Sequence, residues 1–178
     1  MVSRAQLADM DRIEIRLADP GDMPAIRGLC RDYRALLASR VAAGSEILES
    51  YYKAETYEDL LNRLPSLHAR PDGAIFAGAV DGEVTACGMT HRIDATICEI
   101  KRVFVADSAR GLGLGKRLFQ AAMDQARADG YARMVLDTMR VLPEAIALYQ
   151  TLGFTEAAPF YDLDPRFADE ILFFGIDL

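Results

Sequence analysis

The dipeptide Asp81-Gly82 lies between two runs of strand-forming residues, 74–80 and 83–93, and it limits the possible folds more than any other feature of the sequence. Asp-Gly between β-type runs favours the type I′ turn, which joins two antiparallel strands in a tight hairpin. A third run, 96–105, continues the meander. A sheet made only of parallel strands is therefore excluded.

The rest of the chain alternates between strand and helix patterns. Residues 13–17 alternate polar and apolar side chains, and the following Asp19-Pro20-Gly21-Asp22 supplies turn and capping chemistry for a helix that runs toward Ser39. Gly44 and Ser45 interrupt that pattern. Apolar periodicity predicts further helices at 57–67, 114–128 and 143–152, and further strands at 134–138, 154–161 and 171–178. This order predicts an α+β fold, with about four helices flanking a largely antiparallel central sheet of about seven strands.

Length and charge limit the organisation of the chain and its partners. A chain of 178 residues is within the usual size of one domain, so we expect a single domain over residues 1–178. The formal net charge of −7 disfavours a nucleic-acid partner, because phosphate contacts need a surplus of Lys and Arg on one face. Any phosphate-bearing ligand must be held locally, by backbone N–H groups and a few placed cations.

Cysteine usage and hydropathy indicate the compartment. Cys30, Cys87 and Cys98 are odd in number and each lies in an apolar stretch, so we expect reduced, buried thiols. No run of about 18 apolar residues is present to span a bilayer, and the first residues lack the apolar segment of a secretory signal. We expect a cytoplasmic protein without a membrane partner.

A glycine-rich loop separates the third strand of the meander from the next helix, and it reads Arg110-Gly111-Leu112-Gly113-Leu114-Gly115-Lys116. Backbone N–H groups at the start of a helix form its positive end, and glycines let ligand oxygens approach them without obstruction by Cβ. Arg110, Lys116 and Arg117 add local cations. The loop predicts a site for a phosphate or pyrophosphate, with a purely structural turn as the alternative.

Two common phosphate-binding loops fit this segment poorly. A Walker loop needs a glycine five residues before Gly115 and Ser or Thr after the lysine, but the chain has Arg110 and Arg117 at these places. The dinucleotide fingerprint needs G-x-G-x-x-G directly after a strand, whereas here the third glycine comes one residue early. Asp137 would be the ribose-binding acid in that scheme, so an NAD-binding oxidoreductase stays open as an alternative.

Three ordered segments resemble the GNAT acetyltransferase superfamily. The coenzyme A loop of that family, Gln/Arg-x-x-Gly-x-Gly/Ala, is matched by residues 110–115, its central strand by residues 99–105, and its A-x-x-L-Y-x-x-x-G-F segment by residues 145–154. The similarity covers roughly residues 74–160. The first seventy residues fit the family only as a strand followed by two helices.

The resemblance implies a fold and a cosubstrate. A GNAT-like sheet splays beside the third strand of the meander, which leaves backbone groups free to pair with the pantetheine arm of acetyl-coenzyme A (acetyl-CoA). The implied cofactor-binding residues are Val103, Phe104, Val105, Arg110, Gly111, Leu112, Gly113, Leu114, Gly115 and Lys116. The family often has Asn where this chain has Leu142, so one possible contact to the cofactor is missing.

Direct acetyl transfer needs a neutral amine, a polarised carbonyl and a proton for the departing thiolate. Tyr149, in the family position, is the predicted donor of that proton, with ring packing on the sheet as the alternative role. Glu99 is the predicted base, directly or through water, unless it faces solvent or pairs with Lys101 or Arg102. Backbone N–H groups near Val103 are expected to polarise the carbonyl.

The sequence argues against covalent and metal chemistry. Cys87 and His91 would be about 13 Å apart along a strand, too far for a hydrogen-bonded nucleophile and base. Only His68 and His91 are present, so we expect no metal site.

The acceptor is expected near a cluster of aromatic and acidic residues, which suit an amine. The cluster comprises Tyr51, Tyr52, Tyr57, Glu46, Glu49 and Glu55, with Tyr161 and Asp162 as weaker candidates. We expect an N-acetyltransferase that moves the acetyl group from acetyl-CoA to a primary amine of a small molecule or amino acid. Alternatives are a protein or peptide N-acetyltransferase, a non-catalytic acyl-CoA-binding module and the NAD-binding oxidoreductase. A strand at 171–176 is a candidate edge for pairing in a homodimer.

Overall fold

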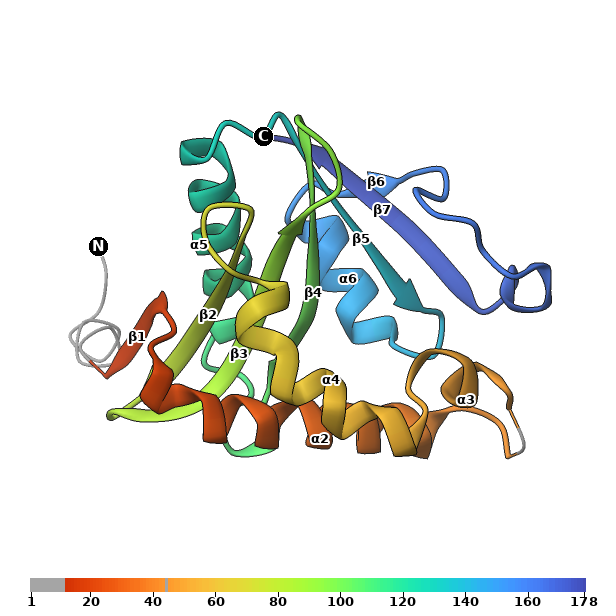
Figure 1. Ribbon diagram of the computed structural model, residues 1–178, viewed down its shortest axis with the longest axis horizontal. Coiled ribbons are helices and arrows are strands. Elements are labelled where there is room, and N and C mark those ends of the chain that lie inside the picture. The colour runs from red at the N-terminus through yellow and green to blue at the C-terminus, as the bar shows by residue number, and fades with distance from the viewer. Residues whose placement is uncertain (1–11, 44) are drawn as a thin grey trace.

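A seven-stranded sheet runs through the part of the chain that the computed structural model describes, residues 12–43 and 45–178 (Figure 1). Its order is β1-β2-β3-β4-β5-β7-β6, and every neighbouring pair is antiparallel except β4 and β5. The strands are β1 (Ile13–Leu17), β2 (Gly73–Val80), β3 (Glu83–Arg92), β4 (Ile97–Val105), β5 (Arg133–Met139), β6 (Thr155–Glu156) and β7 (Ile171–Asp177). The prediction of a mixed, largely antiparallel sheet is confirmed.

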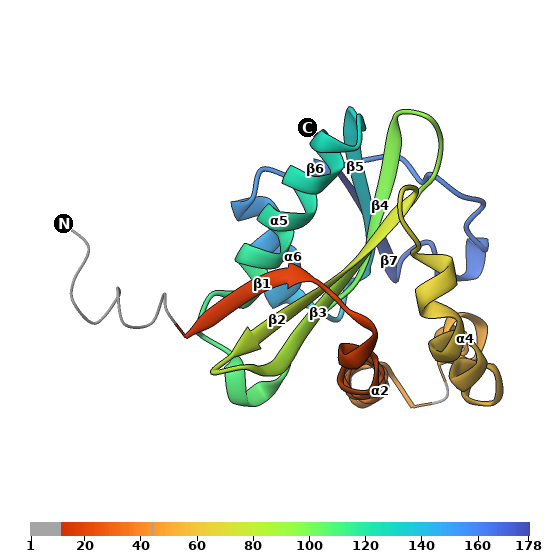
Figure 2. The same ribbon diagram turned by 60° about the vertical axis from the view of Figure 1, so that its left-hand side comes forward.

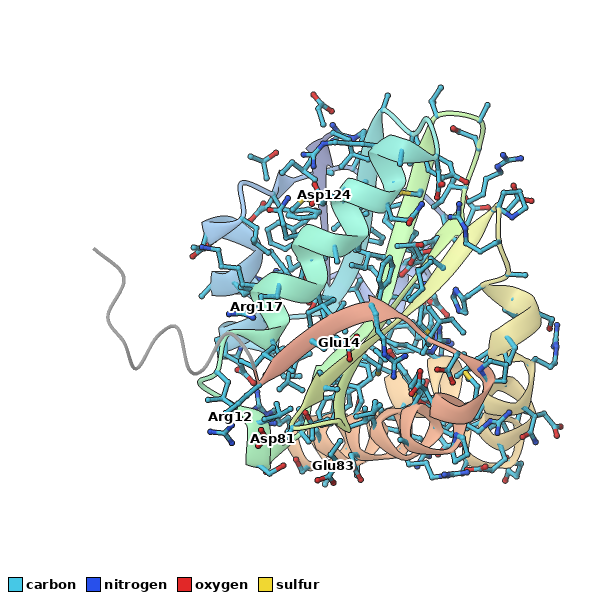
Figure 3. The ribbon with its side chains drawn as sticks, turned by 90° about the vertical axis from the view of Figure 1, so that its left-hand side faces the viewer. Arg12, Glu14, Asp81, Glu83, Arg117 and Asp124 are labelled. Atoms are coloured by element: carbon cyan, nitrogen blue, oxygen red, sulfur yellow. The ribbon has the colours of Figure 1, made fainter. Side chains whose placement is uncertain are left out.

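The turn between β2 and β3 has the predicted geometry. Asp81 and Gly82 both have positive φ, 51° and 83°, as the two central residues of a type I′ turn require. Figure 3 shows Arg12 beside Asp81 at this end of the sheet, where Arg12 Nε donates a hydrogen bond of 2.8 Å to the carboxylate. The hairpin fixes the antiparallel pairing of β2 and β3, and β1 and β4 then pair antiparallel with its two outer sides.

Helices cover both faces of the sheet (Figure 2). Helices α2 (Met23–Arg40) and α4 (Ala54–Leu67) pack on one face, and their buried residues share a core cluster with Met89 and Phe104 of the sheet. Helices α5 (Leu114–Ala128) and α6 (Pro143–Thr151) pack on the other face. The short α3 (Ile47–Tyr51), which the sequence analysis did not predict, lies before α4.

The end of the chain differs from the prediction. Strand β6 has two residues rather than the eight predicted at 154–161, because Pro159 has no N–H to donate to a ladder. Strand β7 pairs with β5 on one side and with β6 on the other, and Ala157 N–H also donates to Phe173 O. The proposal that 171–176 is an exposed edge for a partner's sheet is therefore wrong.

Strands β4 and β5 separate after three residue pairs, as Figure 1 shows. Only Ile97, Cys98 and Glu99 pair with β5, although β4 continues to Val105 and β5 continues to Met139. The predicted splay is confirmed. Beyond Glu99, no strand in the described part of the chain pairs with the side of β4 that faces β5.

The predictions about the cysteines and about a membrane span can be compared with the structure of the described residues. All three cysteines are buried free thiols. Within residues 12–43 and 45–178, none of the helices combines the length and the apolar character needed to cross a membrane. The first residues, to which the prediction about a secretory signal applies, and Gly44, at which the helix pattern was expected to be interrupted, lie outside the described residues.

Candidate active site

Strand β4 contains a bulge beyond Glu99, where it has already separated from β5. Cys87 lies opposite Phe104 and Met89 lies opposite Lys101, so β4 has one residue more than β3 between these pairs. Arg102 lies in this interval with φ of 52°, in the left-handed region that few residues other than glycine adopt. The sequence pattern predicts a regular strand at 96–105, and the bulge departs from that prediction.

The bulge changes the phase of side-chain alternation along β4. Cys98 and Ile100 are buried in the core under α5, and after the bulge Val103 and Val105 pack there instead of residues 102 and 104. Lys101, opposite Met89, belongs to the face that α2 and α4 cover. In a regular strand, Lys101 and Arg102 would face opposite sides of the sheet. With the bulge, both line the same two cavities, which are described next.

Three cavities follow one another through the gap, and Tyr33 lines all of them. The first, of about 240 Å³, is called the cofactor groove here and is lined by Val103, Phe104, Val105, Arg110 and Tyr149, among others. A narrow junction of about 40 Å³ shares Val103 and Tyr149 with it. The third, of about 210 Å³, is called the acceptor cavity and shares Lys101, Arg102 and Asp137 with the junction. The three form a path through the sheet.

The cofactor groove reaches the glycine loop at Arg110, and the other predicted loop residues do not line it. Gly111 and Gly113 have φ of 82° and 79°, and a Cβ on either would meet no atom within 4 Å. Gly113 is the N-cap of α5 and no side chain caps the helix, so the first N–H groups of α5 have no partner in the helix. An uncapped helix start in open space fits a phosphate or pyrophosphate.

The other predicted residues of the loop have different surroundings. Leu114 is buried in the core, so only its backbone can face a ligand, whereas Leu112 and Lys116 are exposed. Arg110 forms an ion pair of 2.7 Å with Asp107. At the far wall of the groove, Leu142 offers an apolar side chain where the family often has an amide.

Tyr149 lies where the cofactor groove meets the junction. Its ring packs against Phe119, Phe154 and Phe174, with centroid distances of 5.4, 6.3 and 5.9 Å. Burial raises the pKa of Tyr149 to about 12, so the hydroxyl keeps its proton at neutral pH. The ring packs on the sheet and the residue also reaches the cavities, so the two predicted roles are compatible.

Glu99 is buried beneath the acceptor cavity. Lys101 Nζ contacts its Oε1, and His91 Nε2 lies 3.2 Å from its Oε2. Lys101 Nζ is also 3.9 Å from Asp137, which lines the cavity wall. Glu99 itself is absent from that wall, so it reaches the cavity through Lys101 and is paired with it, as the sequence analysis had allowed.

Burial sets the protonation of this cluster. It raises the pKa of Glu99, against the opposing effect of Lys101, and it lowers the pKa of His91 to about 4. His91 is therefore neutral at pH 7; its Nε2 lies 3.2 Å from Glu99 Oε2, and its buried Nδ1 finds no partner among the described residues. His68 packs against His91 and donates from Nδ1 to Thr90 O at 3.0 Å.

The structure changes the predicted acceptor cluster. Tyr51 and Tyr52 line the acceptor cavity, but Tyr57 is buried elsewhere and donates to Cys30 O at 2.9 Å. Tyr161, a weaker candidate, donates to Asp137 at 2.8 Å. Glu46, Glu49, Glu55 and Asp162 are exposed and line none of these cavities.

Sequence reasoning missed Arg102, Tyr33 and the contact of His91 with Glu99, and it considered Asp137 only as a ribose ligand. Two adjacent polar residues, Lys101 and Arg102, in an otherwise alternating strand are the signal that could have shown the bulge. No comparable signal marks Tyr33, because its position on the α2 pattern is that of a core residue.

The structure brings no nucleophilic pair or metal cluster together among the described residues. Cys87 Sγ donates to Arg102 O, whereas His91 faces Glu99. Within the described ranges, no group of three or more His, Cys, Asp or Glu side chains is placed to hold a metal ion.

Known proteins share both the sequence pattern and the fold. The IAA acetyltransferase of Azospirillum brasilense is 34% identical over 64% of this chain and 78% of its own length. The uncharacterized N-acetyltransferase YjgM of Escherichia coli (strain K12) is 37% identical, and the N-acetylaspartate synthetase of Homo sapiens is 30% identical. These alignments cover 53% and 67% of this chain but only 58% and 40% of the two relatives.

Solved structures agree on the fold. The PaiA N-acetyltransferase of Thermoplasma acidophilum, crystallised with coenzyme A, superposes with a TM-score of 0.72 at 20% identity, over 93% of this chain and 99% of that one. The family model described as the acetyltransferase (GNAT) family matches residues 41–154, which include the bulge, the glycine loop and Tyr149. The chain therefore belongs to the GNAT family of acetyltransferases.

Proposed function

We propose that this protein transfers the acetyl group of acetyl-CoA directly to a primary amine of a small molecule or amino acid. The observation that carries the proposal is the row of three cavities with shared walls, which extends from Arg110 of the glycine loop, past Tyr149, to a small cavity walled by Asp137 and Lys101. Such a path allows two substrates to approach one point from opposite faces of the sheet. Direct transfer needs this arrangement.

The residues of the groove suit acetyl-CoA. Backbone groups of β4 beyond Glu99 have no strand partner on the β5 side, so they are available to a pantetheine amide. The uncapped start of α5 would hold the pyrophosphate, with Gly111 and Gly113 leaving room for it. A backbone N–H near Val103 would polarise the thioester carbonyl at the junction.

Two side chains would move protons. Glu99, with a raised pKa, would take the proton of the incoming ammonium through water rather than directly, because it does not line the cavity, while Asp137 attracts that cation into the cavity. Tyr149 would donate its proton to the departing thiolate, since its pKa of about 12 keeps it protonated until that step. His91 would hold Glu99 in place.

The acceptor cavity favours a small substrate. Its volume of about 210 Å³ is below the ~300–1,000 Å³ typical of pockets for drug-sized ligands. Two relatives carry names, IAA acetyltransferase and N-acetylaspartate synthetase, that refer to small molecules. A protein or peptide acceptor would have to insert a terminus or side chain into this space.

Calorimetric titration with acetyl-CoA and, separately, with NAD tests the cofactor. We expect acetyl-CoA to bind and NAD not to bind, after which thiol release in the presence of a panel of amines tests turnover. Binding of acetyl-CoA without thiol release from any amine would indicate the non-catalytic module. Binding of NAD alone would support the oxidoreductase.

Tyr149→Phe tests the proposed proton donor. The variant keeps the ring packing against Phe119, Phe154 and Phe174, so we expect unchanged acetyl-CoA affinity and a kcat lower by about 10²–10⁴-fold. Tyr131→Phe is the matched control, because Tyr131 donates to Asp72 O at 3.2 Å, outside all three cavities. Equal turnover of the two variants would remove the role assigned to Tyr149.

A further inference from the structure

Arg102 differs from the other charged side chains of the acceptor cavity in lacking a partner within the described part of the chain. The cavity is lined by three charged residues, Lys101, Arg102 and Asp137. Lys101 contacts Glu99, and Asp137 accepts a hydrogen bond from Tyr161. Among residues 12–43 and 45–178, nothing forms an ion pair or a side-chain hydrogen bond with Arg102, and its Nε is buried without an acceptor.

A buried guanidinium N–H without an acceptor is unfavourable, because burial removes its water and returns nothing. Arginine presents its N–H groups as a planar fork that matches the two oxygens of a carboxylate. The left-handed backbone of Arg102, with φ of 52°, adds a second unfavourable feature at the same residue. Strain and unmet hydrogen bonding at one cavity residue are typical of a binding site.

The charges of the cavity have a polarity. Asp137 and, behind Lys101, Glu99 are negative, whereas Arg102 is a positive group open to the cavity. The ammonium group of a substrate can pair with the negative charges of Asp137 and Glu99, but it leaves Arg102 without an acceptor. A substrate that carries an amine and a carboxylate a short distance apart satisfies both.

We propose that the acceptor is a small amine that also carries a carboxylate, such as an amino acid, and that Arg102 binds that carboxylate in the acceptor cavity. This inference rests on the proposed function and names the substrate class for the same site. The amine of such a substrate points toward Asp137 and the junction, where Tyr149 and Val103 lie. A peptide N-terminus has no carboxylate at this distance and leaves Arg102 unpaired.

The test compares L-amino acids with their carboxamides as acceptors. Thiol release from acetyl-CoA is measured for each pair, such as methionine and methioninamide, and kcat/KM is determined over a range of pH. We expect kcat/KM to be about 10–100-fold higher for the acid of the preferred pair, the range of a charge-assisted hydrogen bond. The amide has the less basic amine, so a preference for the acid cannot come from easier deprotonation.

Arg102→Gln is expected to remove this preference. KM for the acid rises about 10–100-fold, the amide is affected little, and Arg102→Lys restores part of the preference. Arg31→Gln is the matched control, because Arg31 is exposed on α2 and pairs with Glu58 away from the cavities. The affinity for acetyl-CoA is measured for every variant and is expected to stay unchanged.

The outcomes separate this inference from the proposed function. If no amine supports thiol release although acetyl-CoA binds, the proposed function fails. If amines are acetylated but acids and amides have equal kcat/KM, or only amines without a carboxylate react, the proposed function stands and the role of Arg102 is refuted. A loss of acetyl-CoA affinity in Arg102→Gln would assign Arg102 to the cofactor instead.

Discussion

Gly113 at the start of α5 gives a prediction whose sign follows from backbone geometry. Its φ of 79° is unfavourable for an L-residue by about 1–2 kcal/mol. Alanine also restricts the unfolded chain more than glycine does, and this lower unfolded-state entropy offsets about 0.4–1 kcal/mol of the cost. A Cβ at Gly113 would touch nothing within 4 Å, so no steric term is added. We expect Gly113→Ala to lower the free energy of unfolding by about 1 kcal/mol.

Gly28 provides a matched control for the same chemical change. It lies inside α2, and a Cβ there would also meet nothing within 4 Å. Because helical backbone favours alanine over glycine, Gly28→Ala should raise the free energy of unfolding by about 0.5–1 kcal/mol. Gly113→Asn should be less destabilising than Gly113→Ala, since Asn adopts the left-handed region more readily.

Urea unfolding followed by circular dichroism measures these differences, and a thermal melt gives shifts of about 2–4 °C per kcal/mol for a chain of this size. Titration with acetyl-CoA on the same samples should show weaker binding for Gly113→Ala and unchanged binding for Gly28→Ala. If both alanine variants stabilise the protein, Gly113 does not have the left-handed geometry and the account of the loop is wrong. If Gly113→Ala binds acetyl-CoA as the wild type does, the helix start is not the cofactor site.

Two further predictions concern pH. Burial lowers the pKa of His68 from 6.5 to about 4, so the unfolded state binds a proton more readily than the folded state. The free energy of unfolding should therefore fall by about 3 kcal/mol as the pH falls from 6.5 to 4. His68→Gln should flatten this part of the pH dependence measured by urea unfolding, and parallel profiles of variant and wild type would contradict the prediction. Glu99→Gln should lower kcat/KM by about 10²–10⁴-fold near neutral pH, with a deficit that shrinks as pH rises, because more acceptor is then already neutral. A deficit that stays constant with pH in a pH–rate profile would mean that Glu99 is not the base.

Much of the fold follows from local signals in the sequence. The Asp81-Gly82 turn fixes the hairpin, and the apolar spacing of α2 and α5 identifies the faces that pack on the sheet. The end of the chain was less predictable, because 154–161 has strand-forming residues yet contains Pro159. The position of β7 between β5 and β6 depends on tertiary packing, which local sequence patterns do not predict.

The candidate site was predictable where it follows the chain and not where it is assembled across it. The glycine loop and Tyr149 belong to contiguous motifs, so the sequence places them directly. His91 meets Glu99 through the register of β3 and β4, and Tyr33 joins them from α2. The register itself changes at the bulge, and a single unpaired residue there decides which side chains reach the cavity.

The bulge also separates two demands on one strand. Without Arg102, residues 98–105 would alternate without interruption between the core under α5 and the face under α2 and α4. Arg102 is therefore an insertion that neither hydrophobic layer uses. If Arg102 binds the acceptor as proposed, mutation at this position can alter acceptor choice while both cores keep their packing, so that acceptor choice and folding depend on separate positions in the same strand.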